Sequence, residues 1–304
     1  MLYLKGCVRK IGFIGLGIMG KPIVSNILKK GYSVLCYDIN PKPLEELAGL
    51  GAQTAQSVKE IGQTVDTVFT MLPASAHVEE VVLGKEGLLE NIKKDAVIFD
   101  LSSIDPDTAK KIGQICESKN VHFFDSPVSG GEPKAIDGTL TLMTGGNKQI
   151  LETIYPILKT FAEKITWVGE NGAGSTVKLA NQIIVNLNIA AVSEAFCLAA
   201  SCSIDPKIVY EAIRGGLAGS AVLEAKAEKM FTRDFKAGGR IDINQKDIGN
   251  VLKTSHKSGA VLPLTAQLYE MMIALSTAGL QKEDHSAILK YYEKLSCVEV
   301  KTGK

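Results

Sequence analysis

The sequence predicts an α/β fold: a Rossmann domain with a mostly parallel sheet, followed by an all-α C-terminal domain joined through a long helix. In the first half, short β-rich runs alternate with helical segments, which is typical of a parallel sheet covered by helices on both faces. After about Gly174 this alternation stops, and residues 175–201 form an apolar-rich stretch without Pro or Gly, about 40 Å long as a helix. We therefore predict a Rossmann domain over residues 1–171, with an extension at 1–8, and a helical domain over 172–304.

The predicted strands of the first domain are short runs rich in β-branched and aromatic residues, bounded by turn-forming residues. They cover residues 11–14, 33–37, 67–71, 97–100, 121–124, 140–144 and 165–168. Helical segments lie between most of them. The sequence Asp105-Pro106-Asp107 marks one helix start, because it offers an N-cap, a proline in the first turn and an early acid.

The second half contains helical segments, each bordered by Pro, Gly, Ser or Asp. The long helix over residues 175–201 is followed by segments 205–214, 221–229, 244–257, 264–275 and 284–295. Residues 170–174, ENGAG, form a glycine-rich hinge ahead of the long helix. A ligand is expected between the two domains, where the carboxyl ends of the strands face the helical half.

Composition and charge exclude several classes of partner. The chain has 304 residues, 45% of them hydrophobic, and a net charge of +1, so no long-range field attracts nucleic acid. Polar residues, including Asn186 and Glu194, interrupt the longest apolar stretch, and we predict no membrane span. With no export signal and no C-x-x-C pair among six cysteines, a cytoplasmic protein with reduced, mostly buried thiols is expected. The four histidines show no metal-ligand spacing, so no metal site is predicted.

Residues 10–20, KIGFIGLGIMG, carry the strongest motif. Gly15, Gly17 and Gly20 have G-x-G-x-x-G spacing between an apolar run and a helical one. The first glycine permits a tight turn, the second leaves room for a pyrophosphate, and the third lets the helix pack close to the strand. The whole turn is predicted to contact a dinucleotide, including the intervening residues Leu16, Ile18 and Met19.

Asp38 ends the second apolar run, about 20 residues after the glycine turn, where an acid grips a ribose hydroxyl. A 2′-phosphate would meet this carboxylate, and no arginine is adjacent in Ile39 and Asn40. The sequence therefore predicts NAD(H) as coenzyme, with NADP(H) the less favoured alternative.

Residues 172–182, GAGSTVKLANQ, place Lys178, Asn181 and Gln182 on one helix face. The alternative interpretation is a surface lysine on an amphipathic helix. However, the segment carries almost no charge until Glu194, which favours a partly desolvated lysine that donates a proton to a carbonyl oxygen.

Other candidate residues follow strand ends. In DSPVSGG, residues 125–131, Ser129, Gly130 and Gly131 form a turn whose N–H groups would cradle a carboxylate. In TMLP, residues 70–73, Leu72 and Pro73 would flank the cofactor. Each of these, like Ser103 after the strand at 97–100, is by itself also compatible with an ordinary turn.

Lys246 lies in DINQKD, residues 242–247, within a predicted helix. It would face the cleft if the helical half folds back. A solvated ion pair with Asp247 is the alternative interpretation.

These motifs together resemble the β-hydroxyacid dehydrogenase family over nearly the whole chain, from about Lys10 to Val300. The residues that carry the resemblance are GFIGLGIMG from Gly12, SPVSGGEPKAIDGTL from Ser126, GAGSTVKLANQ from Gly172, RGGLAGS from Arg214 and DHSA from Asp284. The run Glu132-Pro133-Lys134 is typical of a reductase subgroup of the family.

The resemblance implies a role for each matched residue. Lys178 would be the catalytic acid in reduction and base in oxidation, with Asn181 orienting lysine and substrate beside Gln182. Ser129, Gly130 and Gly131 would bind the carboxylate and hydroxyl of a small semialdehyde acid. Lys246 would close over cofactor and substrate, and Ser103 would contact the cofactor. The resemblance also implies a homodimer or homotetramer.

Two positions depart from the family pattern. Gly239 stands where an aromatic residue is common, and Asn244 stands where the reductase subgroup often has histidine. These departures leave the semialdehyde open, so the family substrates 3-hydroxyisobutyrate, glyoxylate and succinic semialdehyde remain alternatives. A non-catalytic dinucleotide-binding module is the alternative from another class, and the presence of Lys178 disfavours it.

Overall fold

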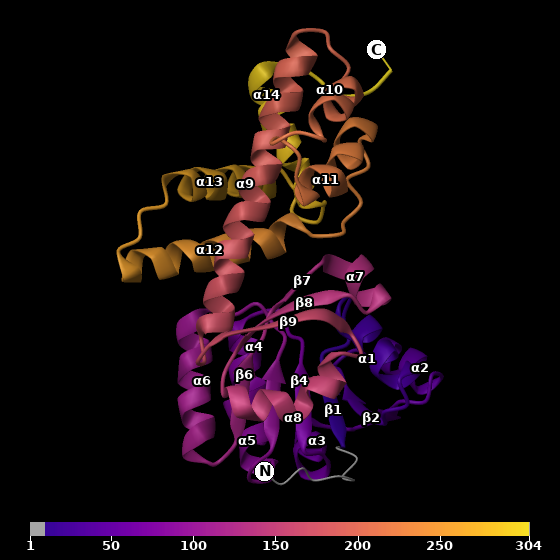
Figure 1. Cartoon of the computed structure of the whole chain (residues 1–304), viewed down its shortest axis with the longest axis vertical. Coiled ribbons are helices and arrows are strands. Elements are labelled where there is room, and N and C mark those ends of the chain that lie inside the picture. The colour runs from indigo at the N-terminus through magenta and orange to yellow at the C-terminus, as the bar shows by residue number, and fades with distance from the viewer. Residues whose placement is uncertain (1–9, 304) are drawn as a thin grey trace. The chain divides into compact units, whose positions relative to one another are not determined.

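The computed structural model of the protein describes residues 10–303 and shows a sheet-containing part and a helical part (Figure 1). Two compact units part between Lys178 and Leu179, here called the first and second unit. Our predicted boundary after residue 171 lies just before the helix that carries Lys178. The predicted extension at residues 1–8, with Cys7, lies outside the described residues.

The first unit is built on one sheet with the strand order β3-β2-β1-β4-β5-β6-β8-β7, and β9 pairs with β8. Neighbouring strands are parallel except where β8 pairs with β6 and β7. This confirms the predicted fold class. The strands are β1 (Ile11–Ile14), β2 (Val34–Tyr37), β3 (Gln53–Thr54), β4 (Thr67–Thr70), β5 (Val97–Asp100), β6 (His122–Asp125), β7 (Val128–Ser129), β8 (Leu140–Gly145) and β9 (Ala162–Gly169).

Helices of the first unit contribute to cores on two faces of the sheet. They are α1 (Gly20–Lys29), α2 (Pro41–Ala48), α3 (Val58–Thr64), α4 (Ser75–Leu83), α5 (Leu88–Asn91), α6 (Pro106–Ser118), α7 (Gly131–Asp137) and α8 (Lys148–Leu158). Along the central strands β1, β2, β4, β5 and β6, side chains alternate between two buried clusters. Phe13, Phe69 and Phe99 pack with α1 and α8, whereas Val68 and Ile98 pack with α3 to α6. Burial on both faces explains why these strands are continuous apolar runs.

The sequence missed two strands and shortened a third. β3 and β7 have two residues each, which is too short for a periodic pattern. β9 begins at Ala162, three residues before the predicted start at residue 165. The prediction missed this part because Glu163 and Lys164 are exposed polar residues and break the apolar run. Asp105 caps α6 as predicted, accepting a hydrogen bond from the Asp107 N–H at 2.8 Å.

The second unit is helical among its described residues. α9 (Ala173–Ser201) enters it from the first unit, and α10 (Pro206–Ile213), α11 (Ala221–Thr232), α12 (Ile241–Ser258), α13 (Pro263–Thr277) and α14 (Ile288–Ser296) follow. The predicted helix over 284–295 was wrong at its start, because His285–Ala287 form a separate short 3₁₀ turn, with Asp284 accepting from the Ser286 N–H, before α14 begins. The predicted helix over 244–257 begins three residues earlier, at Ile241.

Within the described part of the chain, α9 is the one helix that passes a length-and-hydropathy test for a membrane span. Core helices pass the same test, and part of α9 is buried in the protein. This property is therefore weak evidence for a span.

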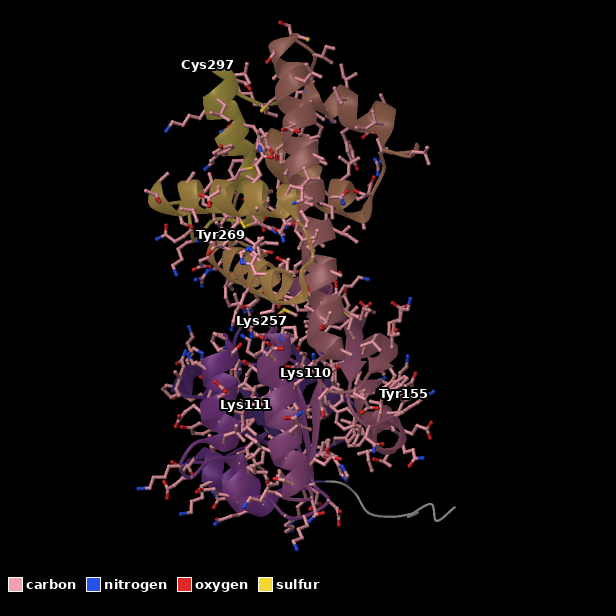
Figure 2. All side chains as sticks on the ribbon, turned by 90° about the vertical axis from the view of Figure 1, so that its left-hand side faces the viewer. Lys110, Lys111, Tyr155, Lys257, Tyr269 and Cys297 are labelled. Carbon is pink, nitrogen blue, oxygen red and sulfur yellow. The ribbon has the colours of Figure 1, made fainter. Side chains whose placement is uncertain are left out.

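Of the five cysteines in the described residues, Cys36, Cys116 and Cys197 are buried and Cys202 and Cys297 are exposed. All five are free thiols. Cys297 follows the end of α14 (Figure 2).

Asp100 is a fully buried carboxylate at the end of β5. Its Oδ1 accepts hydrogen bonds from the hydroxyl groups of Thr70 and Ser102 and from the Ser102 N–H. Burial raises the pKa of Asp100 from 3.8 to about 6, although these hydrogen bonds oppose the rise. The folded protein therefore keeps this proton over a pH range in which the unfolded chain has lost it.

From this shift we predict that the contribution of Asp100 to stability is full below pH ~4 and is lost as pH rises through ~6, a change of about 3 kcal/mol. Asp100→Asn removes the titration. The free energy of unfolding, measured with urea, should therefore rise in the variant relative to the wild type by about this amount between pH ~4 and ~7. Stability curves that remain parallel over this range would contradict the prediction.

Candidate active site

The glycine turn between β1 and α1 has the shape that a dinucleotide requires. Gly15 has a φ of +94°, and a side chain there would collide with the Met71 carbonyl. A side chain at Gly20 would collide with the Gly15 carbonyl, so helix and turn touch through backbone. A Cβ at Gly17 would have nothing within 4 Å. Two glycines thus serve packing, and Gly17 borders open space that fits a pyrophosphate.

Asp38 is linked to this turn. Its Oδ2 accepts a hydrogen bond from the Leu16 N–H at 2.6 Å, and its Oδ1 accepts from the Asn40 N–H at 2.7 Å. A cavity of about 410 Å³ adjoins it. The cavity is lined by Tyr37, Asp38, Pro41, Leu44, Glu45, Ala48, Thr54, Ala55 and Gln56. Because it follows the ends of β2 and β3, this cavity fits the adenosine half of a dinucleotide.

A buried polar chain supports the loops after β4 and β5. The Leu72 N–H donates to the Ser102 Oγ at 2.8 Å, and Ser102 in turn bonds Asp100. Leu72 and Ser103 are half-buried, and Pro73 is exposed. Asp100 and Ser102 were not singled out from the sequence, although a carboxylate ending an apolar run was the available signal.

The SGG segment forms the end of a strand and the start of a helix, not a simple turn. Ser129 belongs to β7 and pairs with Thr141 of β8. Gly130 has a φ of +129°, and a Cβ there would lie 2.6 Å from the Lys134 Cβ. Gly131, with a φ of +66°, begins α7. Glycines are therefore required by backbone and packing, and the carboxylate cradle stays a prediction.

Lys178 is half-buried in the second turn of α9, and its Nζ donates to the Val128 carbonyl at 2.9 Å. Val128 directly precedes Ser129, so the structure brings the ammonium group to the backbone of the predicted substrate segment. Asp125, fully buried at the end of β6, accepts from the Gly172 N–H at 2.8 Å and the Ser175 N–H at 2.7 Å. Burial raises the pKa of Asp125, against these hydrogen bonds. Sequence reasoning gave Asp125 no role.

The remaining predicted residues meet in a buried polar cluster of the second unit. The Gln182 Nε2 donates to Asp247 Oδ2 at 2.7 Å and to Asn244 Oδ1 at 3.3 Å, and the Gln182 Oε1 accepts from Asn181 at 3.0 Å. The Lys246 Nζ lies 3.1 Å from Asp247 Oδ1. The ion pair with Asp247 named as the alternative is therefore present. It is not a solvated pair, because the Asp247 side chain is only 5% exposed. With both polar ends of Gln182 engaged, its geometry favours holding Asn181 over contacting a ligand.

Gly239 lies beside a buried histidine. A Cβ there would be 3.3 Å from the His285 Nε2 and 3.6 Å from the Asn244 Nδ2. The His285 Nδ1 bonds the Asn186 Oδ1 at 2.9 Å, and Asn186 donates its own amide to the Gln182 carbonyl. Asn186 therefore accepts, and His285 donates from Nδ1. An aromatic side chain at position 239 would require His285 to move.

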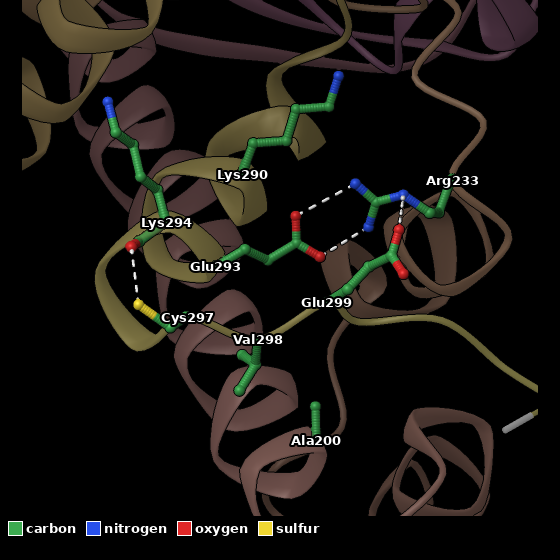
Figure 3. A pocket seen from close by; sticks show the side chains of 8 residues that line it. All are labelled: Ala200, Arg233, Lys290, Glu293, Lys294, Cys297, Val298 and Glu299. Atoms are coloured by element: carbon green, nitrogen blue, oxygen red, sulfur yellow. Dashed lines mark hydrogen bonds and ion pairs between the residues drawn. The ribbon is translucent and has the colours of Figure 1, made fainter.

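A cavity of about 680 Å³ lies in the second unit and is lined by none of the predicted residues (Figure 3). Three of its side chains, Arg233, Glu293 and Glu299, are paired with one another. Arg233 forms two hydrogen bonds with Glu293, at 2.6 and 3.2 Å, and an ion pair with Glu299 at 3.7 Å. Within residues 10–303, no group of three or more His, Cys, Asp or Glu side chains is arranged to hold a metal ion.

Two family models together match most of the chain. The NAD binding domain of 6-phosphogluconate dehydrogenase matches residues 10–169. The NAD-binding domain of NADP-dependent 3-hydroxyisobutyrate dehydrogenase matches residues 172–292.

Curated relatives align over nearly their full length. The chain is 38% identical to 2-hydroxy-3-oxopropionate reductase of Escherichia coli (strain K12), covering 93% of this chain and 97% of the relative. It is 36% identical to 2-(hydroxymethyl)glutarate dehydrogenase of Eubacterium barkeri, covering 97% and 98%. Among solved structures, 3-hydroxyisobutyrate dehydrogenase from Salmonella typhimurium is 30% identical with a TM-score of 0.84, covering 93% of this chain and 99% of that one.

These matches cover both the dinucleotide turn and the lysine-bearing helix, and they support binding of a nicotinamide cofactor. The relatives differ in their named substrates, which limits the shared activity to the family level. The chain is therefore an NAD(P)-dependent oxidoreductase and belongs to the β-hydroxyacid dehydrogenase family.

Proposed function

We propose that this enzyme reduces tartronate semialdehyde (2-hydroxy-3-oxopropanoate) to D-glycerate with NADH. The observation that carries the proposal is the hydrogen bond from the Lys178 Nζ to the carbonyl of Val128, next to Ser129. It brings a proton donor to the segment predicted to bind the substrate carboxylate. The 38% identity to 2-hydroxy-3-oxopropionate reductase supports the choice of semialdehyde.

In this reaction Lys178 donates a proton to the aldehyde oxygen as that oxygen gains negative charge. A nicotinamide coenzyme, when bound, would supply the hydride for the aldehyde carbon. The N–H groups of Ser129, Gly130 and Gly131 hold the substrate carboxylate, which fixes the position of the aldehyde group. Asn181, held by Gln182, orients the lysine and the substrate.

A larger substrate with a second carboxylate is the alternative that a specific observation favours. Gly239 has no side chain, and the His285 Nε2 and Asn244 Nδ2 would lie 3.3 and 3.6 Å from a Cβ at this position. Such a wall accommodates a polar substrate extension better than an aromatic wall does. The relative from Eubacterium barkeri is named for 2-(hydroxymethyl)glutarate, which has a second carboxylate.

The substrate proposal is tested by comparing kcat/KM with NADH for tartronate semialdehyde, methylmalonate semialdehyde, succinic semialdehyde, glyoxylate and 2-formylglutarate. We expect tartronate semialdehyde to give the highest value. Lys178→Ala should fold, bind NADH and lose roughly two to four orders of magnitude in kcat, since it removes the proton donor. A preference for 2-formylglutarate would transfer the assignment to the alternative, and an active Lys178→Ala enzyme would refute the role of the lysine.

We also propose a preference for NADH over NADPH, which rests on the charge around the 410 Å³ cavity. Its lining includes the carboxylates of Asp38 and Glu45 and no Lys or Arg. A 2′-phosphate in this cavity would therefore meet negative charge without a compensating cation.

Asp38→Asn is expected to narrow the ratio of kcat/KM between NADH and NADPH by about 10-fold, because it removes the charge and keeps an oxygen for the Leu16 N–H. Asp38→Ala should narrow the ratio too, and should also weaken NADH binding, since the turn loses its acceptor. The kinetics of both coenzymes are measured at saturating aldehyde. An unchanged ratio in both variants would remove Asp38 from coenzyme selection.

A homo-oligomer, dimer or tetramer, is proposed from the surface of α9. Ile184 and Leu198 are 63% and 69% exposed, and the exposed Ala191 lies between them. These residues recur every seven positions, the spacing with which one helix packs along another. A second copy would present the same apolar stripe and cover this one.

Replacing both Ile184 and Leu198 with Lys should therefore dissociate the assembly, because burying two charges without partners is costly. Molar mass from light scattering during gel filtration is the measurement. Val261→Lys, a change at another exposed apolar residue, serves as the control and should leave the mass unchanged. A monomeric wild type, or a double variant that keeps its assembly, would refute this interface.

A further inference from the structure

The segment Asp125–Ser129 contacts α9 at two places. The Asp125 carboxylate accepts from the N–H groups of Gly172 and Ser175, and the Val128 carbonyl accepts from the Lys178 Nζ. The first contact holds the start of the helix, and the second holds the side chain of the lysine one turn further on. The same segment leads directly into Ser129, Gly130 and Gly131.

The carboxylate satisfies groups that a helix leaves unpaired. The first N–H groups of a helix have no acceptor within it, and the first intrahelical hydrogen bond of this region runs from the Thr176 N–H to the Gly172 carbonyl. Asp125 fills this need from outside the helix, with one oxygen for each N–H group. Its negative charge also interacts favourably with the positive end of the helix dipole.

Asp125 itself has little freedom to move. It is fully buried, and a Cβ on the neighbouring Gly145 would lie 2.6 Å from its Oδ1. A Cβ on Gly174 would collide with the Asp125 carbonyl, so α9 begins in direct backbone contact with β6. The next residue, Ser126, is fixed by a 2.7 Å hydrogen bond between its hydroxyl and that of Thr144 on β8. The end of the sheet thus provides a rigid base for the helix.

We propose that Asp125 is a positioning residue that sets where the ammonium group of Lys178 lies relative to the Ser129–Gly131 segment. It acts only through the helix start and touches neither substrate nor coenzyme. This inference rests on the proposed role of Lys178 in the reduction. It gives the aspartate of DSPVSGG a function distinct from carboxylate binding by the residues that follow it.

Asp125→Asn keeps the size of the side chain but replaces one acceptor oxygen with an amide N–H₂ group. One of the two helix N–H groups then faces a second donor and loses its hydrogen bond. We expect kcat to fall about 10- to 100-fold, the effect of small misplacement of a catalytic group, while the Kd for NADH stays unchanged. Combined with Lys178→Ala, the change is expected to cost no further activity, because Asp125 acts through the lysine.

Asp205→Asn is the matched control. Asp205 caps α10 in the second unit by accepting from the Lys207 N–H at 2.8 Å, and it is not among the predicted site residues. It should leave kcat unchanged. A kcat loss of equal size in the control, an unaltered kcat in Asp125→Asn, or a further loss in the Lys178→Ala background would overturn the positioning role. If Lys178→Ala itself is fully active, the proposed function fails instead.

A measurement on the unaltered protein tests whether Asp125 holds the start of α9, even if the variant does not fold. Amide hydrogen exchange of Gly172 and Ser175 should be as slow as in the strands of the sheet, because both N–H groups donate to a buried carboxylate. The corresponding first-turn amides of other helices should exchange faster. Rapid exchange at both residues would show that the carboxylate does not hold the helix.

Discussion

The contact between the end of β6 and the start of α9 is the constraint on which the lysine-bearing part of the site depends. A helix that begins against a sheet end leaves N–H groups in a buried place, and each unpaired group of this kind costs about 1–3 kcal/mol. One carboxylate, Asp125, satisfies two of them. Because Gly145 and Gly174 remove side-chain bulk, backbone meets backbone there, and Lys178 leaves the helix at a defined point.

The same physical logic organises the coenzyme end of the first unit. Parallel strands bring their carboxyl ends to one edge, and polar groups that follow the strands must be paired with one another or with a ligand. Asp38 bonds the Leu16 N–H, and Asp100 holds Ser102, which holds the Leu72 N–H. Each acid thus links one strand end to the loop after a neighbouring strand.

The fold class could be predicted because its sequence patterns are longer than the usual error in placing the ends of an element. Strands buried on both faces are continuous apolar runs, and a helix of 29 residues is visible as a stretch without Pro or Gly. The two-residue strand β7 left no such pattern, which is why the segment around Ser129 was predicted as a turn. The 3₁₀ turn at His285 was merged with α14 because its cap, Asp284, also suits an α-helix.

The candidate site was predictable where spacing alone determines chemistry. Gly15, Gly17 and Gly20 each have the surroundings that their spacing indicated. Asp125 could not be assigned, because its partners at Gly172 and Ser175 are 47 and 50 residues away in sequence and its role appears only when strand and helix meet. Gln182 was singled out from the sequence, but its bond to Asp247 was not, because that partner is 65 residues away.

Charge then limits how an anionic substrate is held. The chain has a net charge of +1, so attraction must come from individual groups near the substrate. Lys246 offers little net charge, because its ammonium group lies 3.1 Å from the buried carboxylate of Asp247. The pair is better suited to fixing the position of α12 residues than to neutralising an acid. The Lys178 Nζ donates to the neutral Val128 carbonyl at 2.9 Å, which places the ammonium group beside Ser129. In the proposed reaction, this ammonium group and the backbone N–H groups of Ser129 to Gly131 together attract the substrate anion.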